Sequence, residues 1–384
     1  NILALKLQRQ LQVFNLETKA KLKSHMSPQD VIYWRWISAT VLGIVTTSSV
    51  YHWSIEDDAA PQKVFDRHAS LADTQIINYR ASADGKWMVL IGISSNTVDA
   101  NAFRIKGSMQ LYSKERGVSQ PIDGHAAAFA ELKTQDANVP YKLFTFAVRT
   151  STGAKLHIVE IDHAPENPAF SKKTVDVFFP DEATNDFPVA MQVSKRYGIV
   201  YLMTKYGFIH LYDLETGACI YMNRVSGETV FVAAEQKSSN GIIAVNRRGQ
   251  VLSVSVDADT IIPYILRTLN NTDLAFKLAS RGNLPGADEM YLQQFHSLFS
   301  TGQYTEAIKI AANSPRGILR TPQMIEQLKQ VPSQPGTLSP ILQYFGMLLE
   351  SGSLNQHESL ELSKPVLAQG CLLYTSDAAD DSLR

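Results

Sequence analysis

Only two cysteines, Cys219 and Cys371, occur among the 384 residues of this sequence. Two cysteines cannot build a disulfide framework, which favours a reducing compartment such as the cytoplasm. No apolar run approaches the roughly 18 residues that a membrane-spanning helix needs. The formal net charge is only −1. We therefore expect no nucleic-acid partner, and any membrane association should be indirect.

The sequence also lacks the motifs that mark common enzyme classes. It contains no GxSxG, no HExxH, no GxxxxGK[ST] and no cysteine pair at metal-ligand spacing. The nearest groupings are Asp66-Arg67-His68 and His210 with Asp213, which we interpret as hydrogen-bonding residues that tie strands together. We expect no enzyme, no catalytic residue, no metal and no cofactor. A propeller hydrolase or metal-dependent enzyme is the alternative, and it would need an acidic or histidine cluster at a channel.

One hairpin organises the first two thirds of the chain. The alternating run Phe208 to Leu214 is followed by a turn at Glu215-Thr216-Gly217 and a second run from Ala218 to Asn223. A period of two with a glycine-containing turn is typical of a β-hairpin. Similar units recur on both sides, which indicates a repeat protein.

Six segments share the pattern of an alternating strand followed by a polar turn, with centres about 40 to 60 residues apart, the period of propeller blades. They are LQVFNLET (11–18), VYHWSIE (50–56), MQLYSKER (109–116), LHIVEID (156–162), IHLYDLETG (209–217) and VLSVSVD (251–257). We predict an all-β propeller over residues 1–257. Six units fit a six-bladed ring or a seven-bladed ring without its first blade. Because Asn1 is not a Met and the first residues already read as a strand, we expect the second, with an incomplete propeller.

From residue 258 the apolar period changes to about 3.6, which indicates helices up to residue 370. Thr272-Asp273 is expected to cap a helix that runs to about Ser280. Further helices are expected over 287–300, 305–312, after Thr321-Pro322, after Ser339-Pro340, and over 356–368. The pattern around Phe295 and Gly302 is repeated around Phe345 and Gly352. Repeated helical hairpins predict an α-solenoid. Residues 371–384 match neither pattern and read as a cloning or sequencing scar.

Several long motifs resemble the N-terminal part of the clathrin heavy-chain family, almost without a break from Ala4 to Gly370. They are VYHWSIE, FDRHASLADTQIINYR, KGSMQLYS, VSQPIDGHAAAFA, VDVFFPDEATNDFPVAMQ, TKYGFIHLYDLETGACIYMNRVSGET and SPRGILRTPQMI. The resemblance implies a seven-bladed propeller, a helical linker and the start of an α-zigzag leg. Relative to that pattern, the first blade and the start of the second are missing. Ser95 to Lys106 reads as a longer blade loop.

The resemblance also implies three peptide-binding sites. The family's groove for clathrin-box motifs, between the first two recognised blades, matches Leu3, Gln12, Phe14, Lys19 and Lys21. Part of a central-channel site for a Trp-containing motif matches Gln75, Ile77 and Ile93, without the Phe of the first blade. A groove between later blades that takes an arrestin-type loop matches Arg116, Val118 and Gln120.

The residues of the first site also suit such ligands by their own chemistry. In the run Leu11 to Leu16, alternation predicts one face with Gln12, Phe14 and Leu16. Basic Lys19, Lys21 and Lys23 follow, and together they offer an apolar wall beside charges that attract carboxylates. From the residues alone, a core strand beside a solvated hairpin is the alternative. Gln10 stands where the family has Thr, which bears on fine specificity.

The function implied by the resemblance is that of a structural coat subunit of clathrin-coated vesicles. The expected partners are adaptor and accessory proteins with acidic-leucine motifs, and the expected place is the cytoplasmic face of coated pits and vesicles. In the full-length family, clathrin light chain binding and trimerisation use regions outside this sequence. The alternative is another coat or tethering scaffold, because a propeller followed by a solenoid is a shared architecture.

Overall fold

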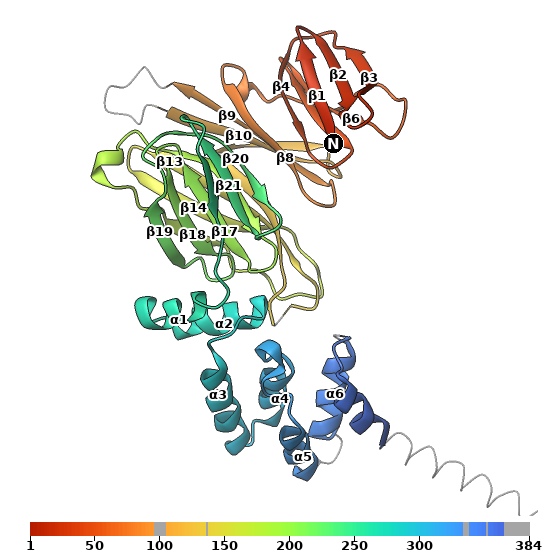
Figure 1. Cartoon of the computed structure of the whole chain (residues 1–384), viewed down its shortest axis with the longest axis vertical. Helices are drawn as coiled ribbons and strands as arrows, with labels where there is room; N and C mark the ends of the chain where they lie inside the picture. The colour runs from red at the N-terminus through yellow and green to blue at the C-terminus, as the bar shows by residue number, and fades with distance from the viewer. Residues whose placement is uncertain (96–104, 136, 333–337, 351, 365–384) are drawn as a thin grey trace, which may run out of the picture. The chain divides into compact units, whose positions relative to one another are not determined.

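The computed structural model describes residues 1–95, 105–135, 137–332, 338–350 and 352–364. It divides into two compact units, Asn1–Val256 and Asp257–Arg384. The first is built from strands and the second from helices, as the change from red through green to blue in Figure 1 shows. The predicted loop from Ser95 to Lys106 lies largely outside the described residues, and the predicted tail over 371–384 lies wholly outside them.

The described strands of the first unit form six antiparallel sheets. Four sheets have four strands and two have three. In chain order, the first sheet has β1(Ile2–Leu7), β2(Gln10–Asn15) and β3(Ala20–Met26), and the second has β4(Val31–Trp36), β5(Val41–Thr46), β6(Ser49–Ser54) and β7(Gln62–Asp66). The third has β8(Gln75–Ala81), β9(Trp87–Ser95), β10(Ile105–Ser113) and β11(Val118–Asp123), and the fourth has β12(Ala126–Leu132), β13(Tyr141–Thr150), β14(Gly153–Asp162) and β15(Lys173–Asp176). The fifth has β16(Pro188–Ser194), β17(Ile199–Thr204), β18(Phe208–Asp213) and β19(Cys219–Arg224), and the sixth has β20(Val230–Gln236), β21(Gly241–Asn246) and β22(Val251–Val254).

The predicted propeller fold is confirmed by the way the six predicted segments are distributed. Each contributes one strand to a different sheet, namely β2, β6, β10, β14, β18 and β22. The organising hairpin is β18 with β19, closed by Gly217 at φ +78°, a conformation that glycine adopts without steric cost. Consecutive sheets meet along their first strands, because β4 contacts β8, and β16 contacts both β12 and β20.

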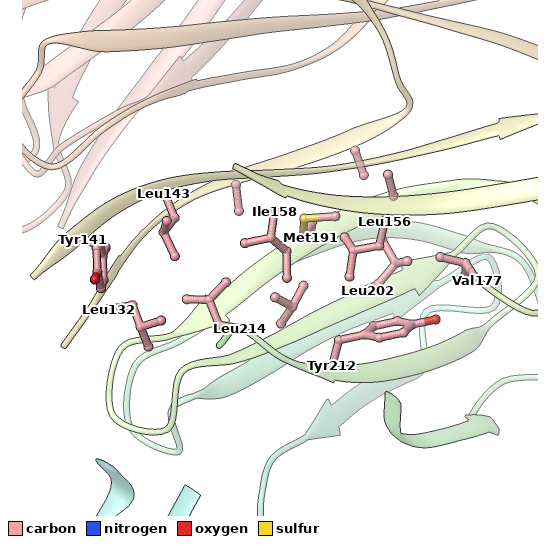
Figure 2. Packing of buried hydrophobic residues seen from close by; sticks show 14 of the residues in the cluster. Leu132, Tyr141, Leu143, Leu156, Ile158, Val177, Met191, Leu202, Tyr212 and Leu214 are labelled. Atoms are coloured by element: carbon pink, nitrogen blue, oxygen red, sulfur yellow. The ribbon is translucent and has the colours of Figure 1, made fainter. Parts of the chain in front are cut away.

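The core lies between neighbouring sheets. Figure 2 shows one such layer, in which Leu143 and Ile158 of one sheet meet Met191, Leu202 and Tyr212 of the next. Every residue of β18 is buried, because a sheet with a neighbour on each face has no solvent side. A single sheet of this kind could not bury both of its faces, so the sheets are stable only as a stack.

The second unit consists of short helices joined by tight turns. They are α1(Ile261–Tyr264), which continues into a π-helical turn η3(Ile265–Leu269), then α2(Thr272–Gly282), α3(Asp288–Ser300), α4(Tyr304–Ala312), α5(Pro322–Gln330), α6(Pro340–Glu350) and a helix over 356–364. This unit also contains a 3₁₀ turn, η4(Pro315–Gly317). Two further 3₁₀ turns, η1(Ala69–Leu71) and η2(Asp181–Ala183), lie in the first unit. The predicted repeat is confirmed: Gly302 and Gly352 both adopt positive φ at the turn between paired helices. Phe295 and Phe345 are both buried.

Two of the helix starts show what sequence can and cannot assign. Thr321 caps α5 as predicted, because its side chain accepts a hydrogen bond from the Met324 backbone N–H at 3.2 Å. The predicted Thr272-Asp273 cap of α2 is wrong by one residue. Asn271 is the N-cap, and its Oδ1 accepts from the Leu274 backbone N–H at 3.0 Å. The end of the last predicted helix, after residue 364, lies outside the described residues.

Candidate functional site

The first predicted peptide site lies on one face of the β1–β3 sheet, the red sheet in Figure 1. Strand pairing places Leu3, Phe14 and Lys21 in one row across its three strands. Leu5, Gln12 and Ser24 form the next row. Residues directly opposite one another point to the same side, so the sheet presents apolar, amide and basic groups together. We call Leu3, Leu5, Gln12, Phe14 and Lys21 the apolar–basic face.

The opposite face of this sheet is core, as the alternation predicts. Leu11 and Val13 are fully buried against Leu42, Ile44 and Trp53, which belong to the β4–β7 sheet. The apolar–basic face therefore points away from the β4–β7 sheet. Leu3 and Leu5 are 39% and 47% exposed, and a peptide would meet an open sheet face at these residues.

The side chains of the three lysines that follow β2 lie in different surroundings. A β-bulge opposite Val13 and Phe14 pairs Val13 with Lys23 and Phe14 with Lys21, so the two lysines lie on opposite faces although they are two residues apart. Lys21 is exposed beside Phe14. Lys23 points toward the β4–β7 sheet, donates to the Ser54 carbonyl at 2.9 Å and lies 5.7 Å from the ring centre of Trp53. Of these three lysines, Lys19 and Lys21 are therefore the two that are exposed to solvent.

Lys19 and Gln10 mark the two ends of the apolar–basic face. Lys19 is exposed in the turn between β2 and β3, with φ at +54°. Gln10 begins β2, and its Nε2 donates to Ser24 Oγ at 3.0 Å. This bond holds the amide along the sheet surface, so the side chain adds a polar rim next to Gln12.

The second predicted site lies at one end of β8 and β9. Gln75 and Ile93 are cross-strand partners, and Ile77 is the extra residue of a bulge in β8. Gln75 is exposed, whereas Ile77 and Ile93 are half-buried. The three side chains are thus near one another at the start of an inner strand, with an accessible amide and two partly covered aliphatic groups.

The third predicted site lies on an edge strand. Val118 and Gln120 are exposed on the same side of β11, whose described hydrogen-bonding partner is β10. Arg116, in the preceding turn, lies 5.9 Å from the ring centre of half-buried Trp87. Sequence reasoning missed Trp87. The pairing of Trp87 with Ser113 across β9 and β10 brings it under this turn, and no sequence spacing reveals that register.

The two groupings that resemble catalytic constellations have structural roles. The His68 Nδ1 accepts from the Ser70 backbone N–H at 3.1 Å and caps η1, and Asp66 accepts from Ser49 Oγ at 2.7 Å. Asp213 Oδ2 accepts from the backbone N–H and the hydroxyl of Thr216, both at 2.8 Å, and fixes the hairpin turn. The Ser70 hydroxyl also lies 3.0 Å from His68 Nδ1, but this contact is made within the same helical cap, between residues two apart in the chain.

His210 is buried between aromatic rings rather than placed in a site. Its ring stacks on Tyr212 and is tilted against Phe179, and neither ring nitrogen has a hydrogen-bond partner among the described residues. Burial lowers the pKa of His210 to about 4, so the ring is neutral at physiological pH. Among the described residues, no group of three or more His, Cys, Asp or Glu side chains could hold a metal ion.

Comparison with known proteins identifies the family. The clathrin propeller repeat model matches residues 180–215 and 223–257, the clathrin heavy-chain linker model matches 259–281, and the clathrin-H-link model matches 283–348. A probable clathrin heavy chain of Schizosaccharomyces pombe is 56% identical over 368 residues, which are 96% of this chain. The chain belongs to the clathrin heavy-chain family. It corresponds to the family's propeller and linker region.

Other relatives give the same assignment. The clathrin heavy chain of Drosophila melanogaster is 56% identical over 371 residues, and human clathrin heavy chain 2 is 52% identical over 370 residues; each alignment covers 96% of this chain. The chain spans 22% of the length of these heavy chains. Among solved structures, Kluyveromyces lactis Hsv2 aligns with a TM-score of 0.44 and 12% identity over 67% of this chain and 72% of that chain, a likeness too weak to carry an inference. In the part of the chain described, no helix is long and apolar enough to cross a membrane.

Proposed function

We propose that this region is the motif-binding end of a clathrin coat subunit, a non-enzymatic structural protein at the cytoplasmic face of coated pits and vesicles. Its propeller binds short extended peptides of adaptor and accessory proteins, and its helical unit leads toward a leg that assembles into a lattice. The family assignment supports the coat role, and the apolar–basic face supports the binding role.

The row Leu3–Phe14–Lys21 is the observation that carries the binding proposal. An extended peptide places alternate side chains on one side. A leucine in such a peptide can cover Leu3 and Phe14, while a neighbouring carboxylate reaches Lys21 or Lys19. Gln12 and Gln10 supply amide groups that can bond to the peptide backbone. The ligand class is therefore an acidic peptide with large apolar residues.

Affinity for one such peptide should be modest because the face is open and half-exposed. Contacts of this size give binding of about micromolar strength or weaker. Several sites on one propeller and many copies in a lattice would raise the overall affinity through high local concentration. We accordingly propose that Gln75, Ile77 and Ile93, and separately Arg116, Val118 and Gln120, are further peptide sites of the same domain.

The edge-strand site has its own supporting geometry. Val118 and Gln120 lie on a strand with one free edge, which is the arrangement that accepts an added peptide strand. Arg116 lies 5.9 Å from the ring centre of Trp87, so its positive charge is attracted to the face of the aromatic ring. A different propeller-and-solenoid coat or tethering scaffold would keep the architecture without these residues, so mutation of the sites separates the two.

Calorimetry with an acidic-leucine peptide tests the proposal. The variant Gln12→Ala with Phe14→Ala should abolish measurable binding, because both side chains lie on the apolar–basic face. The matched control is Gln356→Ala with Leu360→Ala, which likewise removes one amide and one apolar side chain, but from exposed positions of the helical unit. Unchanged affinity in the first variant, or an equal loss in the control, would overturn the assignment of this face.

A further inference from the structure

A cavity of about 510 Å³ lies in the propeller unit; none of the residues assigned to the three peptide sites lines it, although Trp87, which Arg116 contacts, does. It is lined by the ends of inner strands from successive sheets, including Arg35 of β4 and Arg80 of β8. Trp36 and Trp87 form part of its wall, and Lys195 and Lys237 lie at its margin. A cavity of this volume is in the range that holds a small-molecule ligand.

Arg80 is a cation of the cavity that three hydrogen bonds hold in place. Its Nη1 donates to the backbone carbonyls of Ala127 at 3.0 Å and Met191 at 2.6 Å, and its Nη2 donates to Gln192 Oε1 at 2.5 Å. The side chain of β8 thus bonds to strands of two further sheets, β12 and β16. All of these partners are neutral. The positive charge is held in place by hydrogen bonds, and among the described residues no carboxylate lies within ion-pair distance of it.

Arg35 adds a second cation to the lining of the same cavity. Its Nη1 donates to Asn78 Oδ1 at 2.6 Å, another neutral partner. In the described part of the chain, neither Arg35 nor Arg80 forms a salt bridge, and the same holds for Lys195 and Lys237. Burial and the nearby charge of Arg35 lower the pKa of Arg80 to about 10, so Arg80 is still charged at pH 7. Buried charges without a counter-charge are costly.

The acidic groups of the lining do not cancel these cations. Asp84 and Asp162 share Lys142, at 3.0 Å and 2.9 Å, so this cluster keeps one net negative charge, against the two arginines of the lining. Glu131 and Glu235 are exposed, as are Lys195 and Lys237, so water screens all four charges. Glu235 favours the charged form of Arg80, yet it forms no ion pair with Arg80. The inner wall is therefore cationic in a chain whose formal net charge is −1.

We propose that this cavity binds a small polyanion that carries several phosphate groups, of the inositol polyphosphate type. Arg35 and Arg80 would contact phosphate oxygens from two neighbouring strands, because a guanidinium matches their geometry with paired N–H groups. Arg80 has five N–H groups; within the described residues its Nε–H and one Nη2–H form no hydrogen bond and can donate to the ligand. Lys195 and Lys237 would contribute charge at the entrance.

The cavity is distinct from the proposed central-channel peptide site. Both use β8, but Gln75 begins that strand and Arg80 is five residues further on, about 16 Å away at the usual rise of a strand. A bound polyanion would link β4, β8, β12 and β16 through Arg35 and Arg80. It should therefore stabilise the contacts among the sheets without occupying the apolar–basic face.

Titration of the chain with inositol hexakisphosphate tests the proposal. Binding is followed by calorimetry and by the fluorescence of Trp36 and Trp87. We expect saturable binding of one ligand per chain. Arg35→Gln, and separately Lys195→Gln with Lys237→Gln, should weaken the affinity by about tenfold or more. The matched control is Lys106→Gln with Lys172→Gln, which removes the same charge from exposed lysines outside the cavity and should change the affinity by less than about twofold.

Each remaining outcome has a definite meaning. Absence of saturable binding, or an equal loss in the control variant, would overturn the cavity as a polyanion site. Competition by vesicles that contain phosphatidylinositol bisphosphate would support the site and assign its ligand to a lipid headgroup, whereas binding of the soluble compound alone would assign it to a free polyphosphate. An acidic-leucine peptide should not compete with the polyanion, because it binds the apolar–basic face. Absence of polyanion binding would therefore leave the proposed peptide binding unaffected.

Discussion

Lys23 Nζ lies 2.9 Å from the carbonyl oxygen of Ser54 and joins two neighbouring sheets of the propeller. The same ammonium group lies 5.7 Å from the ring centre of Trp53 and bonds to the Asp57 carbonyl. Its side chain is only 11% exposed. This lysine therefore has a structural role, in contrast to Lys21 two residues earlier.

We expect Lys23→Met to lower the free energy of unfolding of the propeller unit by about 1–2 kcal/mol, because it leaves the half-buried Ser54 carbonyl without a donor and removes the cation beside Trp53. Lys21→Met should change it by less than about 0.5 kcal/mol, since exposed substitutions rarely do more. Urea unfolding followed by tryptophan fluorescence measures both, because all four tryptophans lie in residues 1–256. Equal effects of the two substitutions would contradict the assigned difference.

Lys19 and Lys21 should act mainly on the rate of peptide association. We expect Lys19→Glu with Lys21→Glu to slow association of an acidic-leucine peptide by about tenfold or more, because exposed charges steer encounter. Wild-type affinity should fall as salt rises. Stopped-flow fluorescence at low and high salt provides the measurement. Lys106→Glu with Lys172→Glu is the control, and a flat salt dependence would remove the electrostatic part of the proposal.

His210 should make the propeller less stable in acid. Its folded-state pKa is about 4, below the value of about 6.5 in an unfolded chain. The unfolded state therefore binds the proton more readily, so the contribution of His210 is complete above about pH 6.5 and is lost as pH falls to 4 and below, by about 3 kcal/mol in total.

The variant His210→Phe isolates this effect. Phe preserves the aromatic contact with Phe179 and Tyr212 and breaks no hydrogen bond, because neither ring nitrogen of His210 has a partner. We expect a smaller slope of unfolding free energy against pH between 6.5 and 4. His296→Phe is the control, because this exposed histidine lies outside the propeller unit, so the slope of the propeller transition should stay that of the wild type. If both variants kept that slope, His210 would not be the titrating group.

The helical unit should depend on a buried ion pair. The Arg320 Nε donates to Glu358 Oε1 at 2.8 Å, and Tyr344 Oη donates to the same oxygen at 2.8 Å. Arg320→Met should destabilise this unit by about 3–5 kcal/mol, because it leaves the Glu358 carboxylate buried without its cation. Helical circular dichroism during thermal unfolding reports this loss.

An exposed ion pair of the same unit serves as the control for that substitution. Arg316 Nη2 lies 2.7 Å from Asp288 Oδ2, with both side chains nearly half exposed. Arg316→Met should cost less than about 1 kcal/mol. A midpoint shift in Arg320→Met no larger than that in Arg316→Met would show that burial does not strengthen the dependence on Arg320.

The fold was predictable from sequence because its local signals agree with its packing. Alternation placed one strand in every sheet, and Thr321-Pro322 marked the start of α5 through cap chemistry that acts within one turn. Phe295 and Phe345 repeat because equivalent helices bury equivalent positions. Such features depend on residues that are close together in the chain, so they can be predicted from the sequence.

The site was less predictable because it depends on register and on contacts between sheets. Lys21 and Lys23 have the same spacing as two residues on one strand face, yet the bulge opposite Val13 and Phe14 separates them. Trp87 reaches Arg116 only through the pairing of β9 with β10. Arg80 looks like any strand arginine in sequence, and only the meeting of three inner strands gives it a position in the cavity.

The most direct test of the central claim is a methyl NMR titration of the chain, labelled at leucine, with an acidic-leucine peptide. The account predicts concentration-dependent shifts of the Leu3 and Leu5 methyl signals, because both lie exposed in the rows of Phe14 and Gln12. The signals of buried Leu202 and Leu278 should stay in place. Shifts that spare Leu3 and Leu5 while the peptide binds would contradict the assignment of the apolar–basic face as the peptide site.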